Sequence, residues 1–230
     1  LLSALTVAVT FAIHRGHENL ASMEEFGLVD RLALCVHSLV FYLWKTLVPI
    51  GLSPMYELPA TLEPWRWRFV GAAVLALAIT VAALARARRW PALLAAWTAY
   101  GLMLIPVSGL FQNGFQVAAD RYSYLPCLPW ALLAGAGVAQ VVTGGGPARR
   151  ARAAIALTGL ALVVLGTLSW RQTQVWHDTE TLWHRVLAVG TSSVAHSNLG
   201  LLLARAGDTR AAIPHYQEAL RIRPTFAGAW

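Results

Sequence analysis

Residues 193–226 read SVAHSNLGLLLARAGDTRAAIPHYQEALRIRPTF, a stretch with the pattern of two short helices joined by a turn. Apolar residues recur at helical spacing in each half, and Gly207-Asp208 supplies the turn between them. Pro224 ends the second helix, because proline cannot continue one. Small residues allow the two helices to approach closely, and large residues fill the space around those contacts. The small residues are Gly200, Ala212 and Ala219, and the large ones are Leu199, Leu203, Tyr216 and Leu220.

This pattern resembles a tetratricopeptide repeat. One such hairpin cannot bury its own apolar face. We therefore expect a capping helix from Leu182 on one side and a second repeat that starts at 227–230 on the other. An array of this kind offers a concave surface for peptides or partner proteins, and the alternative is a spacer without a ligand. The signature positions are Asn198, Leu199, Gly200, Gly207, Ala212, Tyr216, Ala219, Leu220 and Pro224.

The rest of the chain is much more apolar. The 230-residue sequence is 57% hydrophobic and 13% charged, with a mean hydropathy of +0.54. Soluble domains carry about 25% charged residues, so a soluble enzyme is nearly excluded. Long uncharged runs predict an all-α fold, in which a polytopic transmembrane helical domain precedes the repeat. The predicted segments are 1–13, 29–49, 69–86, 91–109, 124–143 and 153–169.

The segment 29–49 is the least certain span. Arg31, His37 and Lys45 interrupt it, although Arg31 and Lys45 lie near its ends, where long side chains reach the headgroups. The alternative interpretation is an amphipathic helix that lies in the membrane interface.

Arginine clusters predict the orientation. The net charge of +7 could suggest nucleic acid, but the arginines flank apolar runs, as they do in membrane proteins. Two tight turns, at 86–89 and 149–152, carry three arginines each and are predicted to be cytoplasmic. The loops 50–68 and 110–123, and the residues after Trp170, then lie on the opposite face. That face is the periplasm or cell exterior in bacteria, or the lumen in a eukaryote, and we expect a bacterial inner membrane with the repeats on its periplasmic side.

The composition also divides the chain. We expect a membrane domain over 1–170, a linker and capping helix over 171–192, one repeat over 193–226, and the start of a truncated second repeat over 227–230. The chain begins inside an apolar run and stops inside a repeat unit, so we expect it to be a piece of a longer protein.

Asp120, Arg121 and Tyr122 form the strongest candidate site. An aspartate–arginine pair with tyrosines at the membrane surface could bind a lipid phosphate, because a guanidinium is a permanent, forked donor to phosphate oxygens. The alternative is an interfacial anchor in which Asp120 neutralises Arg121.

Other polar residues carry weaker hypotheses. Glu57 and Glu63 could form an acid/base pair, but a packed surface cap fits their proline-rich loop better. Trp65 and Trp67 suggest an interfacial belt. The sequence has no metal-binding motif, and we predict no metal site: His14, His17 and Glu18 fit a solvated flank, and Cys35 and Cys127 fit small packed residues.

Several motifs along the chain combine into one larger pattern. They are Leu104-Ile105-Pro106, VAADRYSYLP at 117–126, Arg171, Trp176 with Glu180-Thr181-Leu182-Trp183, and Asn198-Leu199-Gly200. Taken together, these motifs resemble the C-terminal half of the transmembrane and tetratricopeptide repeat-containing proteins, which belong with the protein O-mannosyltransferase-like enzymes of the glycosyltransferase C superfold. Leu47-Val48-Pro49, Leu52-Ser53 and Tyr56 match an earlier loop of that family.

The resemblance implies a membrane enzyme that moves a sugar, typically mannose, from a polyprenyl or dolichyl phosphate to Ser or Thr of proteins on the non-cytoplasmic face. It implies an inverting displacement, with the catalytic carboxylate in a loop upstream of residue 1, so we expect this piece alone to be inactive. Asp120, Arg121 and Tyr122 would form the donor-phosphate region. The implied partners are the bilayer, the lipid-linked sugar and proteins bound by the repeats, without nucleic acid or a further cofactor.

Two other functions remain open at this point. The chain could be a membrane-anchored interaction protein whose repeats recruit partners without catalysis. It could also be another lipid-linked-sugar protein, such as an O-antigen ligase or polymerase, although no large external loop rich in Arg and His lies between its late spans. For the enzyme, Arg121→Ala is predicted to weaken use of the donor lipid more than folding.

Overall fold

The computed structural model describes residues 27–59, 62–110, 116–226 and 228. The predicted span at 1–13 and the flank that holds His14, His17 and Glu18 lie outside these described residues. So does the predicted start of a second repeat, apart from Gly228. The described part is almost entirely helical, which confirms the predicted all-α class.

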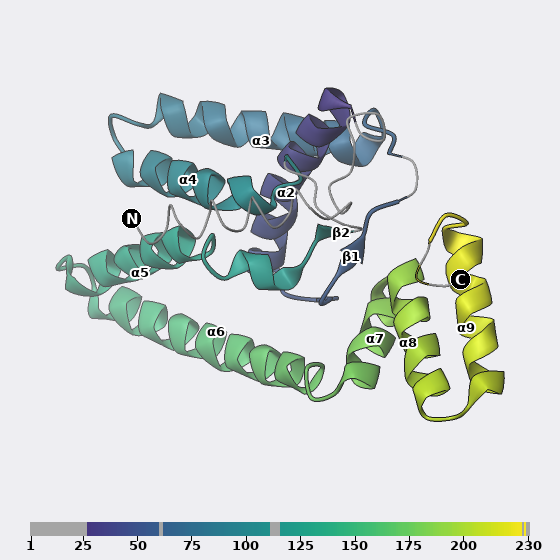
Figure 1. Ribbon diagram of the computed structural model, residues 1–230. Helices are drawn as coiled ribbons and strands as arrows, with labels where there is room; N and C mark the ends of the chain where they lie inside the picture. The colour runs from purple at the N-terminus through teal and green to yellow at the C-terminus, as the bar shows by residue number, and fades with distance from the viewer. Residues whose placement is uncertain (1–26, 60–61, 111–115, 227, 229–230) are drawn as a thin grey trace, which may run out of the picture.

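Four helices, α3 (Trp67–Ala85), α4 (Pro91–Leu104), α5 (Leu128–Thr143) and α6 (Ala148–Gln174), form the predicted membrane part. α3 and α6 are long and apolar enough to cross a membrane, whereas α5 and α4 with its 3-10 extension η1 (Ile105–Val107) are shorter. Figure 1 shows the α3–α4 and α5–α6 turns, which carry the two arginine clusters, at the same end of this group. This agrees with the prediction from the sequence that the two turns lie on the same side.

The first described helix, α2 (Leu28–Leu47), crosses the other helices instead of running alongside them (Figure 1). This arrangement favours the interfacial helix over the span at 29–49. The reason lies in its polar face, which binds the backbone of the segment that follows α4. Ser38 Oγ donates to the Ser108 carbonyl at 3.1 Å, and Arg31 Nη1 donates to the Leu110 carbonyl at 3.4 Å. A helix that satisfies these groups serves as a support for that segment.

Two very short strands pair between the loops that precede α3 and α5. β1 (Tyr56–Glu57) pairs antiparallel with β2 (Gln116–Ala118), with Tyr56 opposite Ala118, and the 3-10 turn η2 (Asp120–Ser123) follows directly. The sequence did not predict this pairing, because two or three residues are too few to show an alternating pattern. The strands join the loop before α3 to the loop before α5.

The apolar core of this domain lies where α2, α4 and β2 meet. It contains Tyr42, Trp97, Tyr100, Leu104 and Ala118, and the Trp97 and Tyr100 rings stack with centroids 5.6 Å apart. The Tyr100 hydroxyl donates to the Leu39 carbonyl at 2.5 Å, which fixes α4 against α2. By contrast, α6 exposes a long apolar surface, with Leu157 and Val163 each 67% exposed. Such a surface fits lipid better than water.

The C-terminal helices form the predicted hairpin with its capping helix. They are α7 (Thr179–Val189), α8 (Ser193–Arg205) and α9 (Thr209–Ile222), and each begins at a side-chain cap. Gly207 has a φ of +88°, the left-handed conformation that the turn between α8 and α9 requires. The cap residues are Asp178, Ser192 and Asp208, which accept from the amides of Thr181, Ala195 and Ala211.

Gly200→Val is expected to destabilise the hairpin by about 1–3 kcal/mol, because it overpacks a closed contact. A Cβ at position 200 would lie 3.0 Å from Cε1 of Tyr216 on α9. Thermal unfolding of the full-length protein would measure the loss. Gln217→Val is the matched control, since this exposed α9 position tests only the lower helix propensity of valine. Equal effects of the two changes would contradict the packing argument.

Acidification from pH 7.5 to 5.5 is expected to loosen the same hairpin. His196 Nδ1 lies 3.1 Å from His215 Nδ1, so at least one ring must be neutral. Burial, and then the nearby His215, hold the pKa of His196 below its usual value. Glu57 and Glu218 act to raise the pKa, and Arg221 acts to lower it. As the pH falls through about 6.5, His196 is protonated in the unfolded chain but stays neutral in the folded protein. The unfolded state therefore binds more protons, and the stability of the hairpin falls with the pH.

Amide hydrogen exchange in α8 and α9 at the two pH values, corrected for the intrinsic rate, would measure this loosening. His215→Gln is the control variant, because it removes the neighbouring imidazole and should reduce the effect of acid. Equal protection of wild-type α8 at both pH values would refute the expectation.

Candidate functional site

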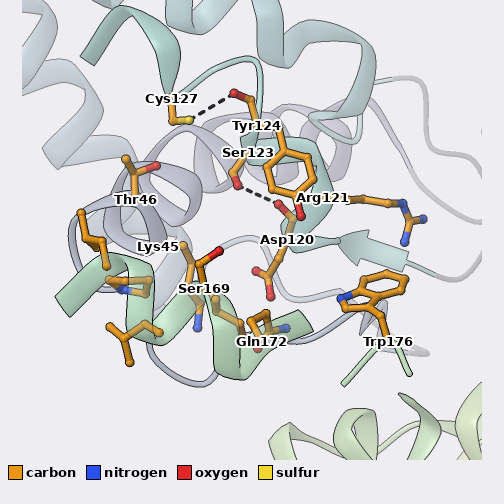
Figure 2. Close-up of a pocket in the computed structure, with 14 residues that line it drawn as sticks. Lys45, Thr46, Asp120, Arg121, Ser123, Tyr124, Cys127, Ser169, Gln172 and Trp176 are labelled. Carbon is orange, nitrogen blue, oxygen red and sulfur yellow. Dashed lines mark hydrogen bonds between the residues drawn. The ribbon is translucent and has the colours of Figure 1, made fainter. Parts of the chain in front are cut away.

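A pocket of about 290 Å³ is lined by segments that Figure 1 shows away from the arginine-rich turns, at the other end of the helical group. Its walls come from the end of α2 and the loop after it, from η2 and the turn that follows, and from the C-terminal half of α6 (Figure 2). The lining residues are Lys45, Thr46, Pro49, Leu52, Asp120, Arg121, Ser123, Tyr124, Cys127, Leu165, Leu168, Ser169, Gln172 and Trp176.

Asp120 is fixed in this pocket by the loop between α2 and β1. Its carboxylate accepts from the amide of Ser53 and from the hydroxyl of Tyr56, whose oxygen lies 3.2 Å from Oδ1 and 3.3 Å from Oδ2. Burial raises the pKa of Asp120, and these hydrogen bonds and the charges of Lys45 and Arg185 oppose that rise. Burial also raises the pKa of Tyr56, so this tyrosine stays a neutral donor. Asp120 therefore ties the loop to η2.

The backbone before Asp120 is held from the other side by Tyr42 of α2. The Tyr42 side chain is completely buried, and its hydroxyl accepts from the amide of Ala119 at 3.1 Å and donates to the Ala119 carbonyl at 3.3 Å. Since Ala119 directly precedes η2, α2 determines where Asp120 lies.

Lys45 is the cation whose side chain reaches the polar part of the pocket. Figure 2 shows its side chain beside those of Asp120 and Gln172. Nζ donates to the carbonyls of Ile50 at 2.7 Å and Gly51 at 3.0 Å. An ammonium has three donors, so these two hydrogen bonds leave one N–H that a ligand can use. Nζ also lies 5.8 Å from the centroid of the Phe41 ring and 5.5 Å from that of the Tyr56 ring. α6 adds two apolar side chains to the lining, Leu165 and Leu168, next to the polar Ser169 and Gln172.

The Arg121 side chain is bound to backbone and side chains outside the polar part of the pocket. Its guanidinium donates to the Pro54 carbonyl at 3.0 Å and to Gln116 Oε1 and the Tyr122 hydroxyl at 3.3 Å each, and it lies over the Tyr122 ring at 4.8 Å. In Figure 2 it points away from the Asp120 carboxylate. Successive residues of a 3-10 turn point about 120° apart, so neighbours in sequence need not share a site.

The predicted donor-phosphate region is therefore divided. Asp120 lies inside the pocket, Arg121 contributes to its rim, and Tyr122 is not among the lining residues. Sequence reasoning gave no role in this site to Gln172 and interpreted Lys45 as a flanking residue. One signal was available, because Lys45 is the only lysine in the sequence. Gln172 lies near the end of α6, after its apolar run, and no sequence pattern indicates that it reaches this pocket.

Glu57 and Glu63, the alternative acid/base pair, have separate partners. Glu63 forms an exposed ion pair with Arg66 at 3.2 Å. Glu57 is buried and contacts the start of α8, where Ser192 Oγ donates to it at 2.6 Å. Both carboxylates thus have structural contacts, in line with the predicted surface cap.

Comparison with known proteins adds two independent findings. The sequence profile of the tetratricopeptide repeat matches residues 193–226. The chain is also 34% identical over 128 residues to "Protein O-mannosyl-transferase Tmtc2" of Drosophila melanogaster, an alignment that covers 55% of this chain and 13% of that protein. The chain carries a tetratricopeptide repeat and is O-mannosyl-transferase-like in sequence. This confirms the resemblance predicted from the motifs.

Two further relatives cover more of the chain. "Protein O-mannosyl-transferase TMTC1" of Mus musculus is 25% identical over 96% of this chain and 24% of its own length. The human protein of the same name is 26% identical over 83% of this chain and 23% of its own length. The chain therefore spans between 13% and 24% of these three relatives. No solved structure matches it.

Proposed function

We propose that the full-length protein is an integral membrane glycosyltransferase that moves a sugar, most simply mannose, from a polyprenyl phosphate carrier to Ser or Thr of proteins. The observation that carries this proposal is the pocket, which combines a lysine ammonium with apolar side chains of a long, exposed apolar helix. A lipid phosphate has the two complementary parts, an anionic head group and an apolar chain. The O-mannosyl-transferase names of the relatives supply the sugar and the acceptor.

In this proposal Lys45 binds the lipid phosphate and Asp120 keeps the loop and η2 in place around it. Lys45 offers its remaining N–H and its charge, which stabilise the phosphate in the bound donor and more strongly as it leaves. Asp120 already accepts from Ser53 and Tyr56, so it acts as a positioning residue and not as the general base.

The reaction is an inverting displacement. The acceptor hydroxyl forms a bond to the anomeric carbon, the bond from that carbon to the phosphate oxygen breaks, and the lipid phosphate leaves with the electron pair. A general base of the full-length protein takes the hydroxyl proton. This chain contributes the donor end of the site.

We further propose that α3 to α6 span a bacterial inner membrane, with the arginine-rich turns in the cytoplasm. The exposed apolar surface of α6 and the position of both turns at one end support this orientation. The pocket and the repeat then lie on the periplasmic side.

Sugar transfer by the full-length protein in isolated membranes would test the proposal. Polyprenyl-phosphate mannose with a labelled sugar is the donor, and the readout is label in protein. We expect transfer by the wild type and a reduced rate for Arg121→Ala at limiting donor, because Arg121 holds the pocket rim through Pro54. If a well-folded protein transfers no label from any of several lipid-linked sugars, the proposed transferase function is rejected.

A second function is favoured by the repeat itself. Residues 193–226 match a tetratricopeptide repeat and fold as its helical hairpin, so the protein could recruit partners to the membrane without catalysis. The same transfer assay separates the two functions.

A further inference from the structure

The carboxylate of Glu57, in β1, is buried against the start of the repeat. The Glu57 side chain is 5% exposed. Its carboxylate accepts from Ser192 Oγ at 2.6 Å, from Ser193 Oγ, and from the amide of Val194 at 3.2 Å. These three residues are the cap and first turn of α8, where unpaired amides and the helix dipole favour an anion. Glu57 therefore completes the N-terminus of the first repeat helix.

Two arginines strengthen this junction from the repeat side. Arg223, just after α9, places Nε 3.8 Å from Glu57 Oε1 and donates from Nη2 to the Leu58 carbonyl at 2.6 Å. Arg185 of α7 donates from Nε to the Leu52 carbonyl at 2.9 Å. All three repeat-side helices are thus connected to the segment 52–58, which is far from them in sequence.

The same segment contributes Leu52 to the lining of the pocket and holds Asp120 there through Tyr56. Neighbouring residues of a strand point to opposite sides, so the two residues of β1 contact different parts of the protein. Tyr56 binds Asp120 of the pocket, whereas Glu57 binds the start of the repeat. One peptide unit therefore separates the contact that shapes the pocket from the contact that holds the repeat.

We propose that Glu57 is a positioning residue that fixes the repeat array relative to the pocket, so that an acceptor polypeptide bound by the repeats presents its Ser or Thr to the donor in one geometry. This inference rests on the proposed transferase function. The ligand of the array is an extended segment of the acceptor protein. A rigid connection raises the effective concentration of that segment at the pocket, whereas a mobile one dilutes it. Without Glu57, the start of α8 loses its carboxylate acceptor, and the bonds of Arg185 and Arg223 to backbone carbonyls remain beside the chain between α6 and α7.

Distances between spin labels in the full-length protein would test the positioning directly. Labels at the exposed positions 63 and 217 report on the segment before α3 and on α9, in a background with Cys35 and Cys127 changed to Ala. We expect one narrow distance distribution in the wild type and a clearly broader one in Glu57→Ala. The matched control is Glu180→Ala, which removes an exposed α7 carboxylate and should leave the distribution narrow. An unchanged distribution in Glu57→Ala overturns the proposal.

Transfer kinetics would test the consequence for the acceptor. We expect Glu57→Ala to lower kcat/KM about tenfold for a protein acceptor that needs the repeats. The rate with a short Ser/Thr peptide should stay unchanged, which also shows that the variant is folded. If Glu57→Ala does not fold, Glu57→Gln is the second variant, because its amide oxygen can still accept one hydroxyl, and it should show a smaller loss of the same kind.

Equal losses for both acceptors contradict a positioning role, because they indicate damage to the pocket itself. Absence of transfer by the wild type rejects the proposed function, yet the distance measurement still decides whether Glu57 fixes the repeat. The two failures are therefore distinguishable.

Discussion

Lys45→Ala in the full-length protein is expected to lower kcat/KM for the lipid-linked sugar donor by about 10- to 100-fold. A hydrogen bond to a charged group contributes about 1.5–3 kcal/mol, and its loss reduces the rate by a factor of that order. The Lys45 ammonium lies in the pocket beside Asp120, with one donor left by its contacts to Ile50 and Gly51. Initial rates at varied donor concentration would measure the change.

Two variants sharpen this test. Lys45→Arg keeps the charge but changes its shape, so we expect a smaller loss than for alanine. Arg66→Ala is the control, because it also removes a cation, but one that directly precedes α3, is exposed and is paired with Glu63. Its kcat/KM should equal that of the wild type. A Lys45→Ala enzyme as active as Arg66→Ala would show that the phosphate binds elsewhere.

Tyr42→Ala is expected to lower the stability of the membrane-side domain by about 3–5 kcal/mol, the range for removing a large buried aromatic ring. Tyr42 is completely buried in the core with Trp97 and Tyr100. Its hydroxyl also satisfies the buried amide of Ala119. Thermal unfolding in detergent would measure the loss.

Tyr42→Phe separates the two contributions. It keeps the ring but leaves the Ala119 amide without its partner, at a cost of about 1–3 kcal/mol. The Ala119 carbonyl still accepts from the amide of Tyr122 at 3.0 Å, so only one group loses its bond. Because η2 follows Ala119, we also expect weaker donor use by this variant. A phenylalanine variant as stable as the wild type would mean that the hydroxyl does not hold this loop.

Local patterns accounted for the helices. The repeat hairpin was predictable because its small and large residues, Gly200 and Tyr216 among them, mark the packing of two neighbouring helices. The long apolar runs of α3 and α6 were equally clear, since the length and composition of a span are properties of one segment. α2 was ambiguous, because whether a helix with Arg31 and Lys45 lies across or along its neighbours depends on partners far away in sequence.

The candidate site was predictable only in part. The sequence drew attention to Asp120 and Arg121 as neighbours, yet the 3-10 turn directs one into the pocket and the other to Pro54. Lys45 and Gln172 join Asp120 from residues 75 and 52 positions away in the sequence, a proximity that no local pattern encodes.

The sequence by itself determined the helical class, the apolar character of the first part, the repeat and the resemblance to O-mannosyl-transferases. Each of these depends on residue type and on spacing within one segment. Only the tertiary structure decided that α2 crosses its neighbours, that Lys45 reaches the pocket, and that Glu57 holds the repeat. These depend on contacts across 60 or more residues, such as Tyr42 with Ala119 and Glu57 with Ser192, which form only when the folded chain buries polar groups that must find partners.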